Sequence, residues 1–103
     1  MNSKVEKILE EYCISRGWKR WTDDDDLFEL LINIDMIQED KIGSHRHWDI
    51  YRRVIKVGDT YIGFITAKTT GDMSAKETGW EFDPDTICEM REVTKTIITY
   101  EPI

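Results

Sequence analysis

Acidic side chains are concentrated in one stretch of the sequence. The segment from Asp23 to Asp40 reads DDDDLFELLINIDMIQED and contains no lysine or arginine. It contributes a charge of -8, whereas the whole chain carries -7, so the remainder is close to neutral. Clustered carboxylates attract lysine and arginine side chains and gain mainly in association rate and specificity. We therefore expect this segment to bind a basic protein through Asp23, Asp24, Asp25, Asp26, Glu29, Asp35, Glu39 and Asp40.

Trp21 is the aromatic residue best placed to support such binding. It follows Lys19 and Arg20 and stands directly before the aspartates, so we predict that it is exposed. An exposed ring beside an acidic patch is a plausible interface anchor. The competing interpretation is that the charges form solvated faces that keep a small domain soluble.

Other residues could support metal chemistry, but less well. His45 and His47 fall on one side of an extended chain, a spacing that can bind a metal. A third ligand would have to come from elsewhere, and Arg46 between them repels a cation. The aspartate run resembles the start of a calcium loop but lacks its glycine and spaced glutamate. We predict no metal site.

Catalytic motifs are equally weak. Asp83 and Asp85 are paired carboxylates in an exposed turn, where little desolvation separates their pKa values. Ser74 has no neighbouring histidine, and no glycine-rich phosphate loop occurs. Cys13 and Cys88 form no C-x-x-C pair and are predicted to be reduced thiols in the core. We expect a protein that is not an enzyme and uses no cofactor.

Length and composition indicate what kind of fold can position these side chains. At 103 residues, 40% of them hydrophobic, the chain is predicted to form one domain with a real core. No apolar run is long enough to span a membrane, and no secretion leader is recognised, so we expect a cytoplasmic protein. The negative net charge argues against direct nucleic-acid binding over a broad surface.

Two helices are predicted first. Val5, Leu9 and Cys13 lie on one apolar stripe, Ser3 with Glu6 forms a capping box, and Gly17 ends a helix spanning about Ser3 to Arg16. The acidic segment fits a second helix, because aspartates favour a helix N-terminus. Its apolar residues also alternate, so a helix that gives way to a strand near Ile32 remains open.

Strands follow. Tyr51–Val57 and Thr60–Thr69 flank Gly58-Asp59, which predicts a type II′ hairpin that pairs Ile55 with Ile62 and Val54 with Gly63. A single helical turn is expected from Asp72 or Ser74 to Gly79, and then a surface crossing pinned by the buried rings of Trp80 and Phe82. Ile87–Val93 and Thr96–Tyr100 are predicted as two strands or one bent strand. We expect an α+β fold, with one or two N-terminal helices on an antiparallel sheet of three to four strands.

A small-ligand site is the alternative to protein binding. Trp48, Tyr61 and Trp80 could wall a pocket in which Arg52 and Arg53 meet a phosphate, as in a nucleotide-sequestering protein. A half-open sheet or an exposed edge could also make a homodimer.

Three segments carry a resemblance to a wider class. HWDIYRRV, GDTYIGFITAKTTGD and GWEFDPDTICE resemble small acidic proteins encoded by bacteriophages and other mobile elements, over about Trp48 to Pro102. Such proteins are often inhibitors of host defence, including anti-CRISPR and anti-restriction proteins, although no functional residue carries over. The resemblance and the charge together predict an inhibitor that occupies the basic groove of a nuclease or other defence effector. An immunity protein against a basic toxin is the alternative.

Overall fold

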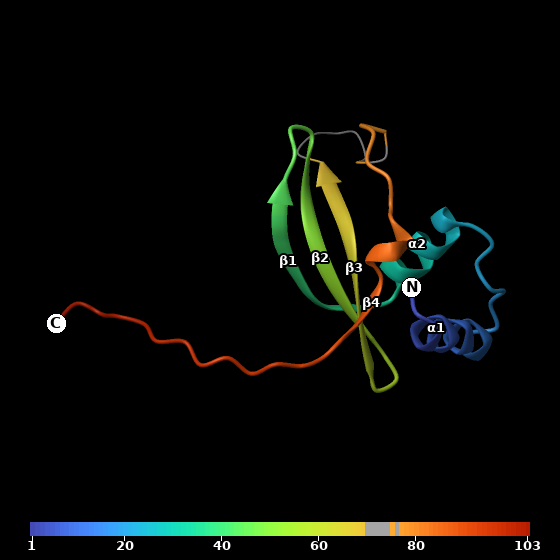
Figure 1. Cartoon of the computed structure of the whole chain (residues 1–103), viewed down its shortest axis with the longest axis horizontal. Helices are drawn as coiled ribbons and strands as arrows, with labels where there is room; N and C mark the ends of the chain where they lie inside the picture. Colours follow the sequence, from blue (N-terminus) through green and yellow to red (C-terminus); the bar gives the residue numbers. More distant parts are fainter. Residues whose placement is uncertain (70–74, 76) are drawn as a thin grey trace.

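Two helices precede a four-stranded antiparallel sheet, so the predicted α+β fold is confirmed. The computed structural model describes residues 1–69, 75 and 77–103. The elements are α1 (Ser3–Ser15), α2 (Asp24–Asn33), β1 (Met36–Ser44), β2 (Trp48–Val57), β3 (Thr60–Thr69), the short 3-10 helix η1 (Pro84–Thr86) and β4 (Cys88–Met90). The strands lie in the order β1-β2-β3-β4, and both helices lie on one side of the sheet (Figure 1).

The first helix is held at both ends by local hydrogen bonds. Asn2, not Ser3, is the N-cap, and its side-chain oxygen accepts from the backbone N–H of Val5 at 2.8 Å. At the other end Gly17 has a φ of 72°, as predicted, and the N–H of Trp18 donates to the carbonyl of Cys13 at 2.9 Å. This turn supplies hydrogen-bond donors to the last carbonyl groups of α1 and directs the chain towards α2.

The hairpin forms in the predicted register. Ile55 pairs with Ile62 and Val54 with Gly63, and the pairing extends to Trp48 with Thr69. Gly58 has a φ of 61°, whereas no non-glycine residue of the described chain has a positive φ. This combination fits the predicted II′ turn and not the I′ turn, which needs two positive φ values.

The core lies between the helices and one face of the sheet. Alternate residues of β2 and β3 point towards the helices, as the period-two geometry of strands requires. Fully buried residues come from α1, α2, β2 and β3, namely Val5, Leu9, Leu31, Ile55, Ile62 and Phe64. The opposite face of the sheet is covered by no helix among the described residues (Figure 1).

The second helix ends earlier than its apolar pattern allows. It stops at Asn33, and the chain from Met36 to Ser44 forms β1, so Ile37 belongs to a strand and not to a helical face. The alternative of a helix that gives way to a strand was the better interpretation. β1 pairs with β2 with register shifts between Met36 and Gln38 and between Lys41 and Gly43. These bulges blur the alternation by which sequence reveals a strand.

The C-terminal strands were overpredicted. Only Cys88–Met90 pairs with β3, and residues 91–103 form no strand and extend away from the sheet (Figure 1). A strand-like composition does not by itself form a strand when the segment pairs with no neighbouring strand.

The connection from β3 to β4 is partly described. The predicted turn at Asp72 and Ser74 lies outside the described residues, while Gly79 has a φ of 104°. Trp80 and Phe82 are half-buried, not buried, because they face a cleft on one side. Among the described residues, no helix is both long and apolar enough to cross a membrane.

Candidate functional site: an acidic and aromatic cleft

The aspartate run divides into two pairs with different environments. Asp23 is the N-cap of α2, where its Oδ1 accepts from the N–H of Asp26 at 2.8 Å. The carboxylate of Asp26 turns back and accepts from the hydroxyl of Thr22 at 2.7 Å. These two aspartates satisfy donors at the start of the helix. Asp24 and Asp25, between them, instead line a cleft.

This acidic and aromatic cleft is formed by α2 and by the segment before η1. Its lining consists of Asp24, Asp25, Phe28, Trp80, Glu81 and Phe82, and its volume is about 310 Å³. The lining therefore combines three carboxylates with three rings and contains no cation. Within the described part of the chain, Asp24 and Glu81 form no ion pair.

Phe28 holds the cleft rings against the core. Its ring centroid lies 5.4 Å from that of Trp80 and 5.0 Å from that of Phe82. On its inner side it meets the buried ring of Phe64 on β3 at 6.4 Å and 82°, an edge-to-face contact. The aromatic part of the cleft is therefore fixed to the sheet, whereas the three carboxylates are exposed.

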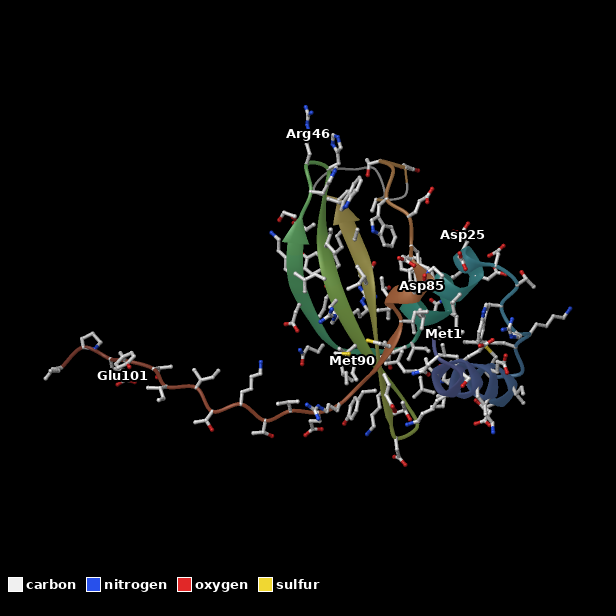
Figure 2. All side chains as sticks on the ribbon, in the orientation of Figure 1. Met1, Asp25, Arg46, Asp85, Met90 and Glu101 are labelled. Carbon is white, nitrogen blue, oxygen red and sulfur yellow. The ribbon has the colours of Figure 1, made fainter. Side chains whose placement is uncertain are left out.

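A second group of carboxylates, Glu81, Asp83 and Asp85, reaches the same region. Asp83 caps η1, and its Oδ1 accepts from the N–H of Asp85 at 2.9 Å. Figure 2 shows Asp25 and Asp85 on the helix side of the sheet, and α2 and η1 are in contact. Carboxylates that are about 60 positions apart in the sequence thus extend one negative surface. Asp83 has a structural role there as a cap, which accounts for one member of the predicted carboxylate pair.

Glu29 and Trp21 line a neighbouring cavity. This cavity of about 380 Å³ lies between α2 and the α1–α2 connection and is also lined by Trp18, Arg20 and Asp26. Trp21 is half-buried, and the guanidinium carbon of Arg20 lies 4.4 Å from its ring centroid. Trp18, with 49% of its surface exposed, is the more accessible ring. The prediction that Trp21 is exposed was wrong, because its ring packs against the core and under Arg20.

The last three predicted carboxylates lie elsewhere. Asp35 is exposed in the connection between α2 and β1, and Asp40 is exposed on β1. Glu39 is only 10% exposed and forms ion pairs with Arg53 and Lys68. Burial raises the pKa of Glu39, but hydrogen bonds from Lys68 and Arg53 outweigh it, so the pKa lies below its ordinary value. Glu39 therefore links three strands instead of contributing to an open acidic surface.

The histidines lie at the β1–β2 turn. The ring of His45 stacks on Trp48 at a centroid distance of 4.0 Å and an angle of 14°. The N–H of His45 also donates to the carbonyl of Trp48 at 2.7 Å. Among the described residues, no group of three or more potential metal ligands occurs. These contacts give the histidines a structural role in the turn between β1 and β2.

The cysteines differ in position. Cys13 is buried in the core as predicted, and its burial raises the pKa of the thiol. Cys88 is exposed on β4, with its sulfur 3.5 Å from that of Met90, so its predicted place in the core was wrong. Both are free thiols.

The rings and arginines of the predicted small-ligand pocket are not brought together. Trp48 pairs with Thr69 at one end of the hairpin, and Tyr61 pairs with Lys56 at the other. At about 3.3 Å per residue, eight residues of β2 separate these ends by roughly 26 Å. Arg52 and Arg53 are consecutive on one strand and so point to opposite faces. Trp80 belongs to the acidic and aromatic cleft.

No family model matches the chain, and no curated protein or solved structure matches it. The interpretation of the cleft therefore rests on its geometry. Sequence reasoning identified Asp24 and Asp25 but missed Phe28, Trp80 and Glu81 as their neighbours. A sequence signal that could have found them is the second group of carboxylates, Glu81, Asp83 and Asp85, which alternates with Trp80 and Phe82.

Proposed function

We propose that this protein is a non-enzymatic binding protein that inhibits a nucleic-acid-handling host-defence enzyme by occupying its basic groove. The observation that supports this most directly is the acidic and aromatic cleft. It places Asp24, Asp25 and Glu81 around three rings that are fixed to the core. The inhibitor would compete with nucleic acid for the same lysine and arginine side chains.

The lining of the cleft matches the chemistry of a lysine or arginine side chain. Carboxylates form the stronger, charge-assisted hydrogen bonds with guanidinium and ammonium groups. The face of Trp80 or Phe82 attracts a cation by about 0.5–2 kcal/mol, depending on its desolvation. Proteins that bind nucleic acid present such cations to phosphates. An arginine or lysine side chain in the basic groove of such an enzyme can therefore leave a nucleic-acid phosphate and bind in this cleft instead.

The surrounding charge supports the approach of such a partner. Asp85 and the exposed carboxylates of α2 extend the negative surface beyond the cleft (Figure 2). Complementary charge of this kind accelerates encounter with a basic surface and weakens with salt. We assign the cleft to recognition and no chemical step to its carboxylates.

The binding test compares two pairs of substitutions that remove the same charge. Asp24→Asn with Asp25→Asn neutralises two carboxylates of the cleft, whereas Asp35→Asn with Asp59→Asn neutralises two exposed carboxylates outside it. The probe is a fluorescent arginine-rich peptide, and its affinity is measured by anisotropy at low and high salt. We expect at least a tenfold loss for the cleft pair, equivalent to about 1.4 kcal/mol. Equal losses for the two pairs would show that only net charge matters.

The inhibition test uses a panel of CRISPR and restriction nucleases cleaving DNA. The native chain should inhibit at least one of them, and additional DNA should relieve the inhibition by competition. The cleft pair should lose the effect while the control pair retains it. If peptide binding depends on the cleft but no nuclease is inhibited, the site stands and the proposed target is wrong.

A further inference from the structure

The C-terminal segment is an apolar strand sequence without a strand partner in the described chain. Residues 91–103 follow β4, form no helix or strand and extend beyond the β1 side of the molecule (Figure 1). Val93, Ile97, Ile98 and Tyr100 are all exposed, Ile97 by 79%. β-branched and aromatic residues in this density are typical of a strand that packs on a neighbour.

The β1 strand is an open edge with matching properties. It is the first strand in the sheet order, so one side of its backbone pairs with β2 and the other side is open. It has nine residues, whereas β4 at the other edge has three. Met36, Ile37 and Ile42 are about half exposed. A long edge strand leaves a row of backbone N–H and C=O groups unpaired, and such a row can pair with another strand.

We propose that two copies of this chain associate by exchanging their C-terminal segments, with residues 93–100 of each copy adding as a strand along β1 of the other. This association is independent of the acidic and aromatic cleft. It covers exposed apolar residues of β1 and of the C-terminal segment, where such residues cluster in the described part of the chain.

The path of the segment favours a second copy over its own β1. Glu92 accepts a hydrogen bond from the hydroxyl of Tyr61 at 3.0 Å, and Val93 and Lys95 line a hollow with Ile37 at the start of β1. The segment thus passes the first residues of its own edge strand before it leaves the body, and Glu101 lies far from the sheet (Figure 2). The sequence VTKTIITY contains no glycine, proline or asparagine that would turn it back.

One antiparallel register matches charge and apolar side chains together. If Lys95 lies opposite Asp40, then a residue-by-residue count puts Val93 opposite Ile42 and Ile98 opposite Ile37, the two positions of β1 that have no partner on β2. Opposite charges and apolar pairs directly across two strands are stabilising. Because the exchange is reciprocal, a twofold axis generates this set of pairs twice.

The mass in solution provides the first test. By light scattering after gel filtration, the full chain at about 50 μM should have about twice its mass of 12.2 kDa. Ile97→Lys with Ile98→Lys should give a monomer with an unchanged circular dichroism spectrum, since these side chains are exposed in the single chain. Ile14→Lys, at an equally exposed site on α1, is the control and should remain dimeric. A monomeric native chain overturns the proposal, as does a dimer that survives the tail substitutions.

Complementation distinguishes exchange from other dimers. An edge variant, Ile37→Lys with Ile42→Lys, should also be monomeric. Mixed with the tail variant, it should form heterodimers detectable by native mass spectrometry, because one intact tail then meets one intact edge. Failure of the mixture to associate overturns the exchange.

Cross-linking tests the register and the alternative of folding back. In a Cys88→Ser background, Val93→Cys with Ile42→Cys should give a disulfide-linked dimer on a non-reducing gel. A disulfide within one chain, seen as a monomer of altered mobility, would show that the segment folds onto its own sheet and would overturn the proposal.

Discussion

Replacing Glu39 by glutamine should destabilise the sheet more than any other single charge removal on β1. The carboxylate lies opposite Arg53 in the β1–β2 register and contacts Lys68 on β3. Its Oε2 accepts from Nε of Arg53 at 2.9 Å and lies 2.7 Å from Nη2. Side-chain exposure is 10% for Glu39, 18% for Arg53 and 49% for Lys68.

These exposures determine the expected magnitude. A fully buried pair costs about 3–5 kcal/mol when one partner is removed, and an exposed pair contributes about 0–1 kcal/mol. The Arg53 contact lies between these limits, and hydrogen bonds to charged groups contribute about 1.5–3 kcal/mol. The Lys68 contact is half exposed and adds little. We therefore expect Glu39→Gln to lower the free energy of unfolding by about 2 kcal/mol.

The pH dependence follows from the lowered pKa of Glu39. A carboxyl whose folded-state pKa lies below its unfolded value stabilises the fold above the unfolded value, here about 4.5, and loses that contribution as pH falls through the folded value. The difference between the native chain and Glu39→Gln should therefore be full at pH 7 and smaller at pH 3.

Urea unfolding at the two pH values measures both effects. With a slope of about 1–3 kcal/mol per molar urea, the midpoint at pH 7 should fall by roughly 1 M. Asp59→Asn, at an exposed carboxylate in the β2–β3 turn, is the control and should change stability by less than about 0.5 kcal/mol. An unchanged midpoint for Glu39→Gln, or a difference that persists undiminished at pH 3, would refute the assigned role.

Three further substitutions test the helices and β4, each by urea or thermal unfolding. Asp23→Ala removes the cap of α2 and should cost about 0.5–2 kcal/mol, whereas Asp24→Ala in the same turn should cost less than about 0.5 kcal/mol; equal costs would contradict the division of the aspartates. Gly63→Ala places a Cβ 2.8 Å from Cγ and Sδ of Met90 and should cost about 1–3 kcal/mol. Adding Met90→Ala should recover part of that loss, and no recovery would exclude the clash. Leu9→Ala, in the fully buried stripe of α1, should cost about 2–5 kcal/mol, and a smaller cost would show that the helix packs loosely.

The sequence determined the features whose causes are local. The stripe of α1, the left-handed Gly17 and the II′ turn at Gly58 depend on residues within one turn or one hairpin. The β2–β3 register followed from the turn alone, because a two-residue loop leaves only one way to pair the strands. The acidic character of the α2 start was also evident from composition.

Tertiary structure decided what depends on distant partners. Residues 36–44 became a strand because they pair with β2, while residues 96–100, with stronger strand composition, pair with no strand in the described chain. Nothing in the sequence distinguished Glu39 from Asp40, yet in the structure the Glu39 carboxylate forms ion pairs with Arg53 and Lys68. The cleft exists because the segment from Trp80 to Phe82 returns to α2 and packs on Phe28. Such contacts arise from packing between segments that are far apart in the chain. The pattern of residues within one segment therefore cannot predict them.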